Sequence, residues 1–119
     1  MRREPGAYLW DVLRSAQNIA DFSQERSFSD YQNDVLLKSG VERQFEIIGE
    51  ALNQLSKVAP QVAAGIPGLP RIVAFRNILI HGYAILDDLT VWEAIDGQLP
   101  SLVVSVQRLL DQIEDKPGS

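Results

Sequence analysis

The chain has 119 residues, of which 45% are hydrophobic and 23% charged, and this length suits one domain with a modest core. Its net charge of −5 disfavours a protein that coats nucleic acid, and the lack of cysteine excludes disulfides and thiolate metal sites. No apolar run approaches the roughly 20 residues of a membrane span, and no signal peptide is recognisable. We therefore expect one cytoplasmic domain over residues 1–119, with a frayed tail at about 116–119 and no membrane association.

The first predicted element is an amphipathic helix over about residues 6–23. Apolar residues recur there at helical spacing, and polar residues fill the opposite face. A polar, turn-rich stretch follows, in which Ser27 or Ser29 can cap a short helical turn.

The longest apolar stripe predicts a helix over about residues 33–58, ended by Pro60. Its apolar residues recur in steps of three or four, from Leu37 to Ala59. Gly40 and Gly49 lie inside this helix, where each costs about 1 kcal/mol relative to alanine. A glycine retained at such a cost often permits the close approach of another helix.

The stretch PQVAAGIPGLP, residues 60–70, is rich in proline and glycine and is predicted to be a loop. The next segment is almost wholly apolar and longer than a typical strand, so we predict a helix over about 69–82 that is buried on most sides. Pro70 can occupy the first turn of this helix, and Gly82 can end it.

A further helix begins near Asp87, with Asp87 or Asp88 as its cap, or Thr90 and Glu93 as a capping box. Gly97 and Pro100 are predicted to break or kink it before a last helix, whose apolar face includes Leu102, Val103, Val106, Leu109, Leu110 and Ile113. Every strong signal is helical. The predicted fold is an all-α, up-and-down bundle of four or five helices.

The sequence RNILIHGY, from Arg76 to Tyr83, contains the only histidine of the chain. At about 100° per residue, Arg76 and His81 point roughly 140° apart on a regular helix, whereas Asn77 and His81 share a face. A site that uses both Arg76 and His81 therefore needs one of two arrangements. The helix ends at Gly82 and lets His81 swing, or a second copy meets the first in a two-fold homodimer.

The residue types of this segment suit the cleavage of RNA. Histidine can transfer a proton near neutral pH, and arginine carries a permanent charge whose shape fits phosphate oxygens. In such a reaction the 2′-hydroxyl attacks the adjacent phosphate. No acidic residue lies between Glu50 and Asp87, so the segment is locally neutral to basic, and nothing in it suggests a metal site or a cofactor.

A structural interpretation of the same residues is also open. His81 would interact with the negative end of its helix dipole, and Arg76 would form an internal ion pair with Glu46 or Glu50. In that case the chain is a small bundle with a buried histidine and no site.

The motif also carries a family resemblance. FRNILIHGY resembles the R-x4-H-x-Y signature of HepT-like proteins of the HEPN superfamily, with the polar Asn77 that commonly follows the arginine. The segment VERQFEIIGEALNQLS, residues 41–56, is similar to the second long helix of that family, and Leu99 and Pro100 also fit the pattern.

The resemblance implies a dimeric all-α bundle in which Arg76 and His81 of both copies line a cleft, with Asn77 in a positioning role. It implies a metal-independent endoribonuclease that acts as the toxin of a type VII toxin–antitoxin system. The partner would be MntA, a minimal nucleotidyltransferase that transfers AMP to the motif tyrosine, here Tyr83. Bulk and negative charge at Tyr83 would hinder RNA from binding. The alternative from another class is a non-catalytic protein- or nucleotide-binding partner of such a nucleotidyltransferase.

Overall fold

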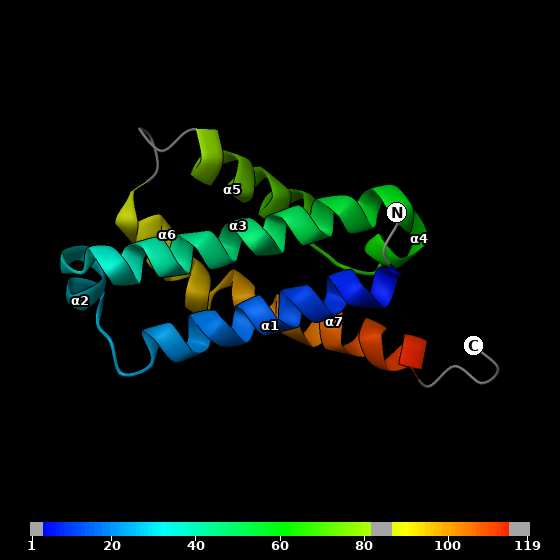
Figure 1. Cartoon of the computed structure of the whole chain (residues 1–119), viewed down its shortest axis with the longest axis horizontal. Helices are drawn as coiled ribbons and strands as arrows, with labels where there is room; N and C mark the ends of the chain where they lie inside the picture. The colour runs from blue at the N-terminus through cyan, green and yellow to red at the C-terminus, as the bar shows by residue number, and fades with distance from the viewer. Residues whose placement is uncertain (1–3, 82–86, 115–119) are drawn as a thin grey trace.

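The structure is a computed structural model that describes residues 4–81 and 87–114. All the regular structure in these two ranges is helical, as predicted (Figure 1). The helices are α1 (Pro5–Ser23), α2 (Phe28–Asn33), α3 (Val35–Val58), α4 (Pro60–Ala63), α5 (Leu69–His81), α6 (Asp88–Asp96) and α7 (Gln98–Glu114). Five of the described helices have nine residues or more, in line with the expected bundle, and α2 and α4 are short additions.

The long helices α1 and α3 lie side by side and run in opposite directions at the centre of the molecule (Figure 1). Helix α7 packs against α1, and α5 packs against α3, so the chain runs up and down through the bundle. Both central helices bury an apolar stripe at helical spacing, which removes apolar surface from water. The core they share includes the fully buried Leu9, Val12, Ile19, Val41, Ile48, Leu52 and Leu55.

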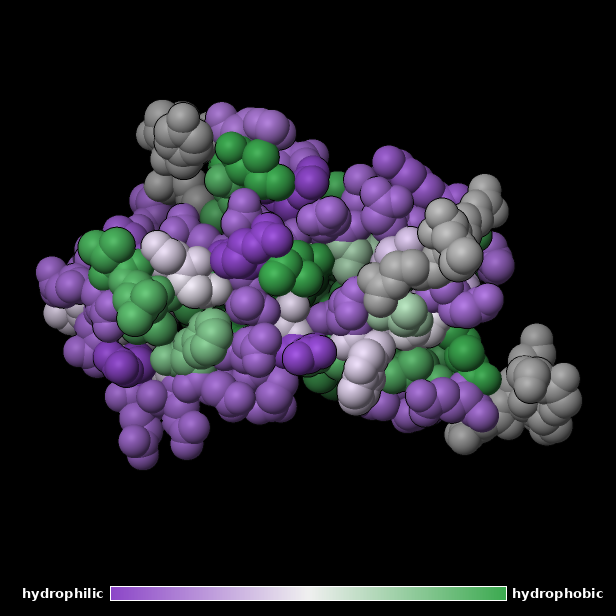
Figure 2. Space-filling view, in the orientation of Figure 1, coloured by the Kyte–Doolittle hydropathy of each residue, from purple (hydrophilic) through white to green (hydrophobic). Residues whose placement is uncertain are grey.

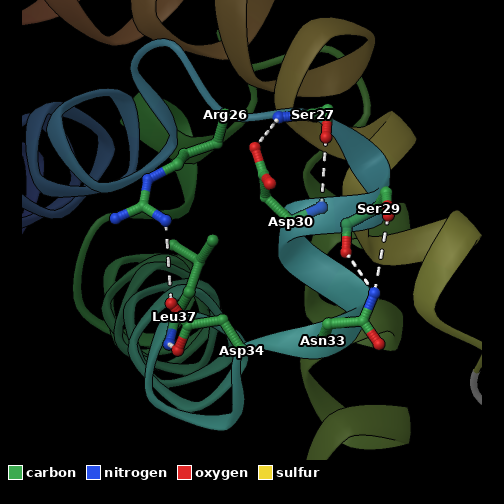
Figure 3. Close-up of polar contacts among 7 residues, drawn as sticks. All are labelled: Arg26, Ser27, Ser29, Asp30, Asn33, Asp34 and Leu37. Atoms are coloured by element: carbon green, nitrogen blue, oxygen red, sulfur yellow. Dashed lines mark hydrogen bonds and ion pairs between the residues drawn. The ribbon is translucent and has the colours of Figure 1, made fainter.

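Side-chain caps fix the turn between α1 and α3, as the close-up in Figure 3 shows. The hydroxyl of Ser27 accepts a hydrogen bond from the backbone N–H of Asp30, and the Asp30 carboxylate accepts one from the N–H of Ser27. Asp34 then caps α3 by accepting from the N–H of Leu37 at 3.0 Å. Of the two predicted caps, Ser27 is therefore the one that starts α2, whereas Ser29 lies inside it.

The structure decides three local predictions. Residues 60–63 form the single turn α4 within the predicted loop, because Pro60 occupies a first position where its missing N–H costs nothing. Of the caps predicted for α6, Asp87 is confirmed: it accepts from the N–H and the hydroxyl of Thr90, and α6 begins after it rather than at a Thr90–Glu93 capping box. Pro100 lies in the first turn of α7, and the break between α6 and α7 falls at Gly97.

None of the helices in residues 4–81 and 87–114 is both long and apolar enough to cross a membrane.

Candidate functional site

Helix α5 carries most of the candidate motif and rests on α3. Its inner face contributes Leu69, Ile72, Phe75 and Leu79 to the core. The ring of Phe75 meets that of Phe45 edge to face, with centroids 5.3 Å apart. This packing fixes the rotation of α5 about its axis and therefore the direction of each motif side chain.

The outer face of α5 is more open than the apolar sequence predicts. Pro70, Arg71, Ala74, Asn77 and His81 are exposed, and the apolar side chains between them are only half-buried. Figure 2 shows a hydrophobic patch near the C-terminal end of this helix, with hydrophilic surface beside it. The prediction of burial on most sides was wrong for the single chain, because α5 packs chiefly against α3 alone.

Arg76 lies at the contact between α5 and α3. Its side chain is half-buried, and its aliphatic part passes over Gly49, where α3 has no side chain. The Nη1 atom donates a hydrogen bond to Oδ1 of Asn77 at 2.9 Å. The Nε atom is buried, and no acceptor in the described part of the chain reaches it.

The internal ion pair proposed for Arg76 is not present. Within residues 4–81 and 87–114, neither Glu46 nor Glu50 pairs with the arginine, whereas ion pairs do join Arg26 to Asp34 and Lys38 to Asp88. The guanidinium therefore keeps its charge uncompensated by a carboxylate contact among those residues, which suits an anionic ligand.

His81 is the last residue of α5, and its side chain is exposed. The structural interpretation predicted a buried histidine, and this is wrong. Asn77 lies one turn earlier on the same exposed face, whereas Arg76 lies toward α3. The regular helix thus separates Arg76 from His81, and no hydrogen bond within residues 4–81 and 87–114 joins the two. Gly82 and Tyr83 lie outside the described residues.

The beginning of α6 is tied to α3. Lys38 of α3 donates a hydrogen bond to the carboxylate of Asp88 at 3.1 Å. Burial raises the pKa of Glu42, which lies one turn further along α3. The buried hydroxyl of Tyr31 has no hydrogen-bond partner in the described part of the chain, and desolvation also raises its pKa.

A separate surface feature lies where α3 begins. Val35 and Leu36 are 78% and 82% exposed, and Figure 2 shows hydrophobic surface at this end of the molecule. A hollow of about 700 Å³ lies beside them, with Phe22, Leu36, Leu37 and Gly40 in its lining. It does not include the motif residues. Across the described residues, no three histidine, cysteine, aspartate or glutamate side chains gather as a metal site would require.

Comparison with known proteins adds to this geometry. The model of the family "Ribonuclease HepT-like" matches residues 12–109. The chain belongs to the HepT-like ribonuclease family. This match begins in α1 and ends in α7, so the HepT-like domain comprises the bundle and not the motif alone.

Named relatives align with nearly the whole HepT-like chain. Two proteins of Methanocaldococcus jannaschii, named "Putative RNase MJ0125" and "Putative RNase MJ1216", are 29% and 30% identical to it over 97% of its length. The alignments cover 98% and 94% of those proteins. A protein of Thermococcus cleftensis named "Probable ribonuclease HepT" is 29% identical over 92% of this chain and 98% of the relative. No solved structure matches the chain significantly.

Sequence reasoning found the motif but missed two features of its setting. The first is the one-sided packing of α5, which the apolar sequence concealed. The second is the contact of Arg76 with Gly49, whose only sequence signal was a glycine inside a long helix.

Proposed function

We propose that this HepT-like chain is a metal-independent endoribonuclease whose site forms between two copies. The observation that carries the proposal is the arrangement of Arg76 and His81 on α5. Arg76 is anchored beside α3 without a carboxylate partner among the described residues, and His81 is exposed at the end of the same helix. The membership of the HepT-like ribonuclease family supports RNA as the substrate.

The direction of the side chains supports a site made by two copies. Because α5 is helical up to His81, one copy presents its arginine and its histidine on different sides. Two α5 helices that meet through their open outer faces would bring two copies of each residue to one groove. The exposed Ala74 and Asn77 and the half-buried apolar residues on α5 supply a face suited to such a contact.

The reaction follows from the residue types. His81 accepts the proton of the 2′-hydroxyl as its oxygen attacks the neighbouring phosphorus, and a histidine then returns a proton to the leaving 5′-oxygen. Arg76 stabilises the negative charge that develops on the phosphate oxygens. Asn77 holds Arg76 in place through its amide oxygen. The chain cleaves without a metal because proton transfer and charge stabilisation are both supplied by side chains.

The biological setting belongs to the same proposal. The chain is a cytoplasmic toxin of a type VII toxin–antitoxin system, and its antitoxin is an MntA-like nucleotidyltransferase that transfers AMP to Tyr83. Tyr83 lies two residues after His81 in the sequence, so an adenylyl group there adds bulk and negative charge next to the proposed groove. RNA phosphates would then be repelled.

The test is the cleavage of single-stranded RNA in the presence of EDTA. We expect the wild type to cleave and His81→Ala to lose at least 10²-fold in rate, about the contribution of general acid–base catalysis. Equal cleavage by both proteins, or none by either, contradicts the proposed activity. In the latter case, binding of the wild type to the nucleotidyltransferase would identify a non-catalytic partner.

A further inference from the structure

We infer that Gly49 is a positioning residue for Arg76, because it provides the bare backbone surface on which the arginine side chain is oriented. Gly49 is buried in the middle of α3, far from either end of that helix. The consequence for catalysis rests on the proposed function, whereas the effect on the arginine itself does not.

The contact leaves no room for a side chain at residue 49. A Cβ atom added to Gly49 would lie 2.6 Å from Cγ of Arg76 and closer still to its Cβ, and 3.5 Å from its Cδ. Real Cβ atoms essentially never approach another heavy atom within 3.0 Å. The Cβ atom of Arg76 is fixed to the backbone of α5, so it cannot rotate away. An alanine at residue 49 must therefore push α5 off α3 at the level of Arg76.

The surface at Gly49 determines which edge of the guanidinium faces outward. The stem of Arg76 lies across Gly49, its Nε atom is buried, and its Nη1 atom donates to Asn77. A phosphate arriving from solvent can then reach the Nη nitrogens but not the edge that contains Nε. Gly49 and Asn77 thus hold the arginine from opposite ends, one at the stem and the other at the tip.

Gly40 provides a matched control on the same helix. A Cβ atom added there would meet only the ring of Phe22, at 3.3 and 3.4 Å. That ring belongs to a side chain that is 40% exposed and can shift. Gly40→Ala and Gly49→Ala make the same chemical change and gain the same helix propensity. In Gly40→Ala the new methyl group meets the ring of Phe22, whereas in Gly49→Ala it meets the Cβ and Cγ atoms of Arg76.

The first measurement follows Arg76 itself in the full chain. In ¹H–¹⁵N spectra, the buried Nε–H of Arg76, assigned by its loss in Arg76→Lys, is expected to exchange slowly with water. Gly49→Ala should shift this signal and speed its exchange at least tenfold, whereas Gly40→Ala should leave it unchanged. An unchanged signal in Gly49→Ala overturns the inference.

The second measurement is the rate of RNA cleavage. Misplacement of a catalytic group by about 1 Å can cost on the order of 10²-fold in rate. We expect Gly49→Ala to lower kcat at least tenfold with a smaller change in KM, and Gly40→Ala to keep both. A kcat in Gly49→Ala equal to that of Gly40→Ala contradicts the catalytic part of the inference. A wild type without ribonuclease activity contradicts the proposed function instead, and the Nε–H measurement still decides the role of Gly49.

A third measurement applies if Gly49→Ala folds poorly. Arg76→Gly removes the Cβ atom that the new methyl group would meet. The drop in Tm caused by Gly49→Ala should therefore be at least halved in the Arg76→Gly background. An equal drop in both backgrounds would show that the glycine is required for reasons other than Arg76, and the inference would be overturned.

Discussion

Asn77 shows at the level of one residue how a short hydrogen bond can serve the proposed site. Its side chain is exposed, and its Oδ1 atom accepts from Nη1 of Arg76 at 2.9 Å. Asn77 follows Arg76 directly in the sequence, and adjacent residues of a helix do not share a face. The bond forms because the long arginine side chain turns back across the helix surface.

We predict that Asn77→Ala lowers RNA cleavage about tenfold with little change in stability, because exposed positions contribute little to folding. The comparison variant is Asn77→Asp, which keeps an acceptor and adds a negative charge. It should bind RNA more weakly through repulsion of phosphate. The measurements are kcat, KM and Tm of the three proteins, and an Asn77→Ala enzyme with wild-type kcat would exclude a positioning role.

Glu42 supports a prediction about pH. Burial raises the pKa of this carboxyl above its ordinary value of 4.5, so the folded state favours the protonated form. The protonated Glu42 therefore contributes to the free energy of unfolding fully below its pKa in the unfolded state. This contribution is lost as the pH rises through the higher pKa of the folded state. Glu42→Gln removes this ionisation and should therefore be more stable than the wild type at pH 7.

The measurement is urea unfolding at pH 7 and at about pH 4. The advantage of Glu42→Gln should shrink at the lower pH, where the wild-type carboxyl is already largely protonated. Glu46→Gln on the same helix serves as the comparison. A Glu42→Gln variant that is less stable than the wild type at pH 7 would show that attraction to Lys38 outweighs burial.

At the level of whole elements, α3 packs against α1, α2, α4 and α5, and its start is fixed by Asp34. That carboxylate caps the first turn at Leu37 and also lies 3.7 Å from Nη1 of Arg26 (Figure 3). Both groups of the ion pair are exposed to solvent, so the cap is expected to matter more than the pair.

Substitution can separate these two contributions. Asp34→Ala loses both and should cost about 1 kcal/mol in the free energy of unfolding. Asp34→Asn keeps a capping oxygen and loses only the charge, so it should retain most of the stability. The measurement is chemical denaturation, and equal losses in both variants would mean that the ion pair dominates.

For the whole molecule, the decisive question is whether two copies meet through α5. We predict that the wild type sediments as a dimer of the 13.3 kDa chain and that Ala74→Glu sediments as a monomer. Ala74 is exposed on the outer face of α5, one turn from Asn77 and two turns from His81, so the glutamate should disturb association and not folding. Ala74→Glu should lose RNA cleavage together with dimerisation.

Leu36→Glu is the matched control for that experiment. Leu36 is 82% exposed at the start of α3, outside the motif, and the same charge placed there should leave both the dimer and the activity intact. A monomeric wild type would contradict the predicted dimer. A dimer that dissociates in Leu36→Glu and persists in Ala74→Glu would place the contact between copies away from α5.

The sequence by itself determined the helical class, the positions of the long helices and the motif on α5. Apolar spacing and turn residues act over a few neighbours, so their effects can be worked out along the chain. The same local reasoning offered Ser27 as one of two possible caps and separated Arg76 from His81 by angle. It correctly ended the long helix before Pro60, but it missed that Pro60 also begins α4 and that Pro100 lies in the first turn of α7.

Only the tertiary structure decided what lies around the motif. The exposed flank of α5, the absence of an ion pair between Arg76 and Glu46 or Glu50, and the contact with Gly49 depend on how α5 rotates and packs on α3. These two helices are brought together by edge-to-face rings and buried aliphatic side chains from distant parts of the chain. Such contacts have no local sequence signal, because the distance and angle between two packed helices depend on the side chains of both helices.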